Sequence, residues 1–221
     1  MPAAPGFPAF IALFATIAAF IMTGLAPLPA SAQTPLRIVA FGDSLTAGYG
    51  LPPESAFPVL LEAALRARGH NVSIANAGVS GDTTTGGLAR LDWSVPDGTD
   101  AVILELGAND MLRGIDPAIA RQALDAVITR LKARNIAVLL AGMRAAPNLG
   151  QAYAERFEKI YTELASKHDL VLYPFFLDGV TGDNARVLPD GLHPNEAGVK
   201  TIVERILPTV EKFIVSLQAA R

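Results

Sequence analysis

Short apolar runs alternate with longer amphipathic segments five times between Leu36 and the C-terminus. An apolar run bounded by turn residues is typical of a strand buried on both faces, and apolar residues spaced by three and four predict a helix. We expect strands over residues 36–41, 71–75, 100–106, 136–141 and 170–173, and helices over residues 55–68, 83–91, 117–134, 151–167 and 195–217. This alternation predicts an α/β fold, a three-layer α/β/α sandwich with a five-stranded parallel sheet of flavodoxin-like strand order.

Two details of this pattern are open to test. The run at 100–106 has the apolar residues 101–104 at its middle, and we expect this strand at the centre of the sheet. Pro208 lies inside the last predicted helix, where a proline removes one backbone hydrogen bond and often breaks the helix.

The first 32 residues have the layout of a secretory signal peptide. A nearly unbroken apolar run from Phe10 to Leu25 precedes Ala30-Ser31-Ala32, an A-x-A cleavage site. We expect cleavage after Ala32, a single domain over residues 33–221, and a periplasmic or secreted protein. Because Met1–Pro8 contains no Lys or Arg, an uncleaved membrane anchor is the alternative, although the run is slightly short for a span of about 20 residues.

The composition narrows the classes of function. The formal net charge is −3 and the sequence has no basic patch, which argues against nucleic acid as a partner. The chain has no cysteine, so a disulfide framework, a thiolate nucleophile and cysteine-ligated metals are excluded. We expect a monomer that needs no cofactor or metal and has no stable membrane association once the leader is removed.

Polar residues gather directly after the predicted strands. Asp43 and Ser44 follow the first strand, 76–82 follows the second, 107–110 follows the third, and 190–194 precedes the last helix. Because the carboxyl ends of parallel strands lie on one edge of a sheet, we expect these four segments to converge there. Small residues beside each polar one allow backbone amides to approach a ligand.

The chain contains three histidines that could serve Ser44 as a base. His70 follows a charged helix end, and His168 lies between Lys and Asp near another helix end, so we expect both to be solvated. His193 stands three residues after Asp190 in one of the converging segments. The alternative is that Asp190 and His193 only shape the loop that caps the last helix.

A serine hydroxyl becomes an effective nucleophile only when a neighbouring base takes its proton. We expect Ser44 to be the nucleophile, His193 the base and Asp190 the acid that orients the imidazole. The tetrahedral oxyanion then needs donors, and the candidates are the backbone N–H groups of Ser44 and Gly81 and the side-chain amide of Asn109. Asn109 as a turn residue that bonds its own loop is the alternative.

Other residues receive a structural interpretation. We expect Asp43, Asp82 and Asp110 to bond nearby backbone and brace their loops, and Trp93 to lie in the core. A hard-cation site formed by these three acids and Asp190 with His193 would indicate a metal phosphoesterase, but such sites usually draw on several histidines. A lipid-binding protein without catalytic activity is a further alternative.

Four short blocks carry a family resemblance. The chain resembles the GDSL or SGNH hydrolases in blocks that follow the family's order: Gly42-Asp43-Ser44-Leu45, Ser80-Gly81-Asp82, Gly107-x-Asn109-Asp110 and Asp190-x-x-His193. One such block is a weak signal, whereas four in order make a specific one. The resemblance implies a catalytic triad of Ser44, Asp190 and His193, and an oxyanion hole of Ser44, Gly81 and Asn109.

The sequence is most similar to one branch of that family, the periplasmic acyl-CoA thioesterase I, lysophospholipase and arylesterase group. The likeness extends through Thr46-Ala47-Gly48-Tyr49, Gly87–Leu91 and Leu104–Gly107. It implies an acyl-enzyme on Ser44 and a broad range of small ester and thioester substrates. These are aryl esters, short- to medium-chain acyl esters and acyl-CoA, with lysophospholipids as a further class. The segment 110–115 would flank the acyl groove, and the alternative within the family is a carbohydrate O-acetylesterase.

Overall fold

A computed structural model describes residues 1–4, 6 and 34–219 of the chain. The apolar run and the cleavage site of the predicted leader lie outside the described residues. Among the helices that are described, none combines the length and the apolar character needed to cross a bilayer.

The domain is built on a five-stranded sheet in which every neighbouring pair is parallel. The strand order is β2-β1-β3-β4-β5, which confirms the predicted flavodoxin-like topology and the central position of β3. The strands are β1 (Leu36–Gly42), β2 (Val72–Gly78), β3 (Ala101–Glu105), β4 (Ala137–Ala141) and β5 (Val171–Tyr173).

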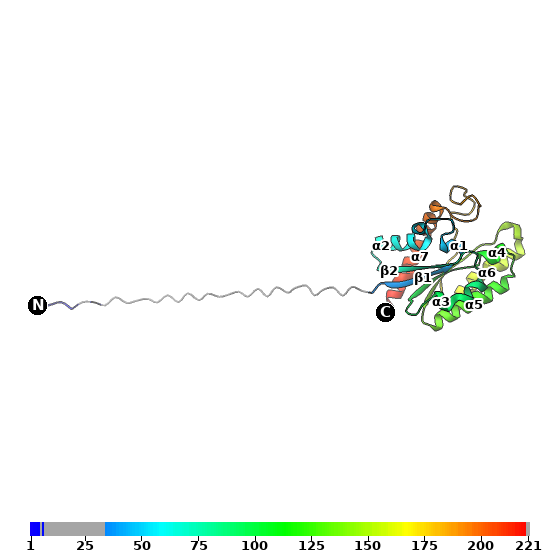
Figure 1. The fold of residues 1–221 in the computed structure, drawn as a ribbon. Helices are drawn as coiled ribbons and strands as arrows, with labels where there is room; N and C mark the ends of the chain where they lie inside the picture. Colours follow the sequence, from blue (N-terminus) through cyan, green and yellow to red (C-terminus); the bar gives the residue numbers. More distant parts are fainter. Residues whose placement is uncertain (5, 7–33, 220–221) are drawn as a thin grey trace. The chain divides into compact units, whose positions relative to one another are not determined.

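Helices cover both faces of the sheet. Figure 1 shows α2 and α7 on one face and α3, α5 and α6 on the other, which confirms the three layers. The long helices are α2 (Phe57–Ala67), α3 (Thr84–Ser94), α5 (Pro117–Ala133), α6 (Gln151–His168) and α7 (Glu196–Ala219). The short ones are α1 (Ser44–Ala47), α4 (Ala108–Leu112) and the 3₁₀ turns η1 (Pro53–Ser55) and η2 (Pro147–Leu149).

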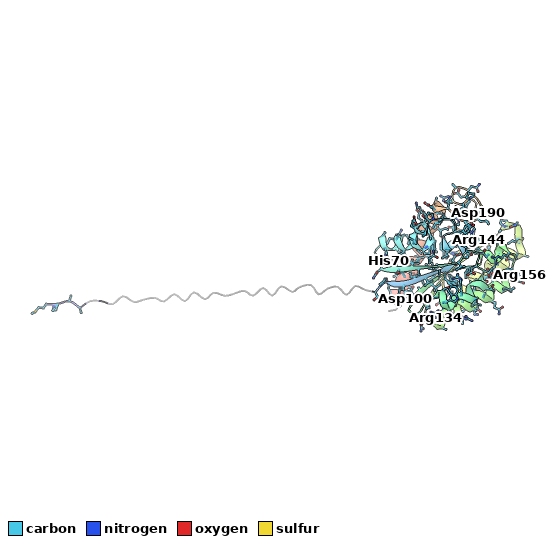
Figure 2. All side chains as sticks on the ribbon, viewed as in Figure 1. His70, Asp100, Arg134, Arg144, Arg156 and Asp190 are labelled. Atoms are coloured by element: carbon cyan, nitrogen blue, oxygen red, sulfur yellow. The ribbon has the colours of Figure 1, made fainter. Side chains whose placement is uncertain are left out.

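The register of the sheet brings the ends of the strands level. Gly42 of β1 pairs with Gly78 of β2 and with Glu105 of β3, and Glu105 pairs in turn with Ala141 of β4. The loops that follow these residues therefore start from one row. Figure 2 shows Asp190 and Arg144 toward this end of the domain, and His70 and Asp100 toward the opposite end.

The cap predicted for α5 is present, whereas the proline inside α7 does not interrupt that helix. Asp116 caps α5 by accepting a hydrogen bond from the backbone N–H of Ala118 at 3.0 Å, with Pro117 as the first helical residue. Helix α7 runs through Pro208 without a break. Its buried neighbours Leu207 and Val210 pack into the core, and this tertiary packing offsets the lost backbone hydrogen bond.

Two expectations about burial were wrong. Trp93 is 73% exposed, because the buried face of α3 runs through Gly87 and Leu91 and Trp93 points away from it. The edge strand β2 is buried only at Val72 and Ile74, and Ala75, predicted as its last residue, is exposed. The strand also extends to Gly78, so Asn76 belongs to it and not to the loop that follows. An edge strand has a neighbour on one side only, so full burial of its residues is not required.

Candidate active site

Ser44 lies at the junction between β1 and α1. It is the first residue of α1 and only 8% exposed, and Asp43 before it caps the helix by accepting a hydrogen bond from Leu45 N–H at 2.9 Å. The turn needs a glycine at position 42. A Cβ there would lie 2.1 Å from Thr46 Oγ1 and 2.6 Å from the carbonyl oxygen of Glu105. The serine thus follows a position at which β1 lies directly against Thr46 and Glu105.

Asp190, His193 and Ser44 form one continuous chain of hydrogen bonds. His193 Nε2 lies 3.0 Å from Ser44 Oγ, and His193 Nδ1 lies 2.7 Å from Asp190 Oδ2. The Tyr49 ring packs against the imidazole with a centroid separation of 4.4 Å. The structure therefore brings together the three residues that the sequence predicts as nucleophile, base and acid.

Backbone hydrogen bonds within its own loop hold the Asp190 carboxylate in position. Asp190 Oδ1 accepts backbone N–H bonds from Leu192 at 2.9 Å and from His193 at 3.0 Å. These two bonds, together with the bond to the His193 ring, lower the pKa of Asp190 to about 2. A carboxylate that stays ionised at neutral pH can hold the imidazole in one tautomer and stabilise the imidazolium.

The candidate oxyanion donors face the same cavity as Ser44. This cavity of about 810 Å³ is lined by Ser44, Gly81, Asn109 and His193. The backbone N–H of Ser44 opens α1, where first-turn N–H groups have no partner inside the helix. Gly81 has a φ of +85°, a left-handed conformation that favours glycine. The three predicted donors thus surround one space beside the hydroxyl.

Asp43 also determines how the Asn109 amide is oriented. Asp43 Oδ2 accepts a hydrogen bond from Asn109 Nδ2 at 3.1 Å, which leaves the second amide hydrogen for a ligand in the cavity. Asp43 is fully buried, and this burial raises its pKa to about 6. The prediction that Asp43 braces its loop holds for the bond to Leu45, whereas its bond to Asn109 links it to an oxyanion donor.

Sequence reasoning assigned no role to Glu105, the last residue of β3. It is fully buried, and its Oε2 accepts hydrogen bonds from Thr46 Oγ1 at 2.8 Å and from the Asp43 N–H at 3.4 Å. Burial, and then the nearby Asp43 carboxyl, raise the pKa of Glu105 well above its ordinary value. Its Oε1 is buried without a hydrogen-bond partner in the part of the chain that the structure describes. An acidic residue inside an otherwise apolar strand is the signal that identifies it.

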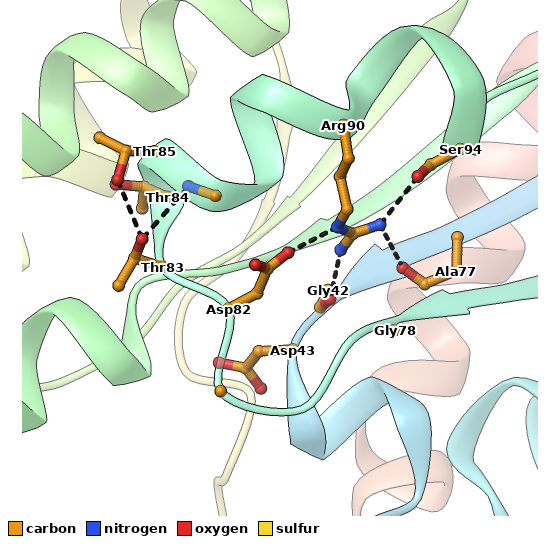
Figure 3. A network of polar contacts seen from close by, with 12 residues as sticks. Gly42, Asp43, Ala77, Gly78, Asp82, Thr83, Thr84, Thr85, Arg90 and Ser94 are labelled. Carbon is orange, nitrogen blue, oxygen red and sulfur yellow. Dashed lines mark hydrogen bonds and ion pairs between the residues drawn. The ribbon is translucent and has the colours of Figure 1, made fainter.

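Sequence reasoning also assigned no role to Arg90 of α3, which Figure 3 shows at the centre of a polar network. Its guanidinium donates to Asp82 at 2.5 Å, to the carbonyl of Gly42 at 2.8 Å and to the carbonyl of Ala77 at 2.9 Å. It also lies 4.2 Å from the centroid of the Phe41 ring. Arg90 therefore ties the ends of β1 and β2 to the loop that carries Gly81.

The other two histidines are engaged elsewhere, and neither is simply solvated. His70 lies 3.4 Å from Glu211, and His168 lies 2.6 Å from Asp125, with both rings largely buried. Each ring lies against a carboxylate of a neighbouring helix, Glu211 of α7 or Asp125 of α5, so the expectation that both histidines are solvated was wrong.

The remaining acids of the predicted loops also have protein partners. Asp110 accepts hydrogen bonds from the Thr84 N–H at 2.8 Å and from Thr84 Oγ1 at 2.6 Å, while Asp82 binds Arg90. Within residues 1–4, 6 and 34–219, no three His, Asp or Glu side chains are grouped so that they could hold a metal ion.

Comparisons with known proteins show the family of the chain. Residues 40–200 match the GDSL-like Lipase/Acylhydrolase family. The arylesterase of Vibrio mimicus is 38% identical over 188 residues, which cover 85% of this chain and 94% of that protein. The Escherichia coli K12 protein named thioesterase 1/protease 1/lysophospholipase L1 is 38% identical over 177 residues, covering 80% and 83%. The crystal structure of AlinE4, an SGNH-hydrolase family esterase, superposes with a TM-score of 0.69 at 47% identity and covers 80% of this chain and 96% of AlinE4.

Proposed function

Because the chain belongs to the GDSL-like lipase/acylhydrolase family, we propose that it hydrolyses carboxylic esters and acyl thioesters through an acyl-enzyme on Ser44. The observation that carries this proposal is the chain of hydrogen bonds from Ser44 through His193 to Asp190 at the wall of the cavity.

The reaction has two halves. In the first, Ser44 Oγ attacks the substrate carbonyl while His193 Nε2 takes the hydroxyl proton, and the oxyanion accepts hydrogen bonds from Ser44 N–H, Gly81 N–H and the Asn109 amide. His193 then passes the proton to the departing alcohol or thiol, which leaves an ester between the acyl group and Oγ. In the second half, water attacks this ester with His193 as base, and the acid and free Ser44 are formed.

The cavity walls support an acyl substrate of short to medium length. Most of the lining near Ser44 is apolar, and Met111, Leu112, Met143, Phe175 and Leu177 contribute to it. Met111 and Leu112 belong to the segment expected to flank the acyl groove. An acetyl group would leave most of these side chains without contact, so this lining favours acyl esters and thioesters over a carbohydrate O-acetylesterase.

Hydrolysis of p-nitrophenyl butyrate by the purified protein tests the proposal. We expect turnover by the parent chain, a loss of about 10⁵-fold or more in Ser44→Ala, and labelling of the parent by a fluorophosphonate. Ser80→Ala is the matched control, because Ser80 lines the cavity in a neighbouring loop, and it should keep its activity. Equal rates for the parent and Ser44→Ala would refute the assignment of the nucleophile.

We also propose that the chain is exported and cleaved after Ala32. The apolar run and the A-x-A site support this proposal. The mass of the protein recovered from the periplasm or medium should correspond to a chain that begins at Gln33. A full-length chain recovered with the membrane fraction would favour the anchor instead.

A further inference from the structure

The cavity lining contains one positive charge that the chain does not neutralise. Asp178 and Arg144 both line it, and Asp178 is paired with Arg205 at 2.5 Å. Arg144, which follows β4, has no carboxylate partner among residues 34–219 and is exposed. Its guanidinium carbon lies 5.0 Å from the centroid of the Phe175 ring. An aromatic face that holds one side of a guanidinium leaves the N–H groups at its edge available to an anion.

A second cation strengthens the positive potential at this edge of the sheet. Arg113 Nη2 donates to the carbonyl oxygen of Gly81 at 2.7 Å, and no carboxylate in the described ranges pairs with it. The domain as a whole carries a formal charge of −3, and the ionised Asp190 also lies at this edge of the sheet. The attraction for an anion is therefore local to the guanidinium groups and does not extend over the whole cavity.

We propose that Arg144 binds a phosphate group carried by the leaving group of the substrate. This inference rests on the proposed esterase and thioesterase function. An ester has two parts, and the apolar lining suits the acyl part, so a negative charge on the substrate belongs on the leaving group. A phosphate offers the oxygen geometry that a guanidinium binds with two parallel hydrogen bonds. Arg144 thereby selects phosphate-bearing alcohols and thiols over neutral ones.

Two pairs of substrates with the same acyl chain test this role. Decanoyl-CoA is compared with the neutral thioester S-decanoyl-N-acetylcysteamine, and decanoyl-lysophosphatidylcholine is compared with monodecanoylglycerol. In Arg144→Gln we expect KM for the phosphate-bearing partner to rise about tenfold or more, as loss of a hydrogen bond between charged groups implies. The neutral partner should stay within about twofold, since it makes no such bond.

Two further variants sharpen the test. Arg156→Gln is the matched control, because Arg156 is also exposed but pairs with Asp116 and does not line the cavity. Arg156→Gln should leave KM unchanged for both substrates of each pair. Arg144→Lys keeps the charge but loses the paired hydrogen bonds, so its KM should fall between those of the parent and Arg144→Gln. The rise in KM should also become smaller as salt is added, because the ion pair between Arg144 and the phosphate is exposed to solvent.

The outcomes separate this inference from the proposed function. A selective effect on decanoyl-CoA or on decanoyl-lysophosphatidylcholine supports a phosphate site and identifies the source of the phosphate. Equal effects on charged and neutral partners, or no effect, would overturn the role of Arg144 while the esterase function stands. If the parent chain hydrolyses none of the four substrates, the proposed function itself fails.

Discussion

The two sides of the candidate active site are built in different ways. On the nucleophile side, which we define as Asp43, Ser44, Arg90, Glu105 and Asn109, the contacts join residues far apart in the chain. Asp43 and Glu105 are both fully buried there. On the base side, Asp190 and His193 belong to one loop, and their side chains are 38% and 22% exposed. The nucleophile side is thus part of the core, and the base side is a local structure placed against it.

Because of this difference, substitutions on the two sides should affect the stability of the protein and its catalytic rate differently. Buried polar groups that lose a partner cost free energy of unfolding, because no water replaces the lost hydrogen bond. Truncation of exposed side chains in a loop changes the free energy of unfolding only a little. Substitutions on the base side should therefore remove activity and keep the fold, whereas those on the nucleophile side should weaken the fold as well.

The largest effect is expected for His193→Ala. The loss of the base should lower kcat about 10⁵-fold on p-nitrophenyl butyrate, because the triad works as a unit. The free energy of unfolding in urea should change by less than about 1 kcal/mol, since the ring is partly exposed. A fall of several kcal/mol would show that the base side is also structural.

Arg90→Gln should have the largest effect on stability. Its guanidinium is 6% exposed and binds Asp82, so removing the charge leaves a carboxylate unpaired in a nearly buried site. We expect a loss of about 3–5 kcal/mol in the free energy of unfolding. Arg130→Gln is the matched control, because the Arg130–Asp92 pair is exposed and 3.8 Å long, and it should cost less than about 1 kcal/mol. Similar losses in the two variants would contradict the special role of Arg90.

Asp43→Asn tests whether Asp43 positions an oxyanion donor. An amide at position 43 presents a donor where Asn109 needs an acceptor, so the Asn109 side chain should turn away and kcat should fall about 10²-fold. Asn109→Ala should have a similar effect, and the double variant should lose no more than the worse single variant. Fully additive losses would mean that Asp43 acts on the reaction by another route.

The smallest effect is expected for Glu105→Gln and depends on pH. Because the folded-state pKa of Glu105 is raised, its contribution to stability is complete below its ordinary pKa of 4.5 and is lost as the pH rises through the folded value. Glu105→Gln does not titrate, so its stability relative to the parent should improve as the pH rises from 5 to 9. Urea unfolding at several pH values measures this, with exposed Glu54→Gln as control. Parallel curves for parent and variant would contradict the raised pKa.

The same contrast explains how much could be predicted from the sequence. The convergence of Ser44, Gly81, Asn109 and His193 follows from a general property of parallel sheets, namely that strand ends share an edge. The predicted strand order is the simplest doubly wound arrangement of five alternating strands and helices. The pairing of Asp190 with His193 is local and is visible in their spacing. The contacts of Glu105 and Arg90 depend on how closely β1 approaches β3 and on which face of α3 is buried. A single sequence carries only faint signs of both, and the exposure of Trp93 depends on the same choice of face.

The loop of the base side closes on itself. Leu188 N–H donates to the carbonyl of His193 at 2.7 Å, and Val187 and Pro194 form an antiparallel bridge beside it. Acid and base therefore belong to a single loop that is held by its own hydrogen bonds and packs against Tyr49. A shift of that loop would move His193 and Asp190 together relative to Ser44, because the two side chains are bonded to each other within it.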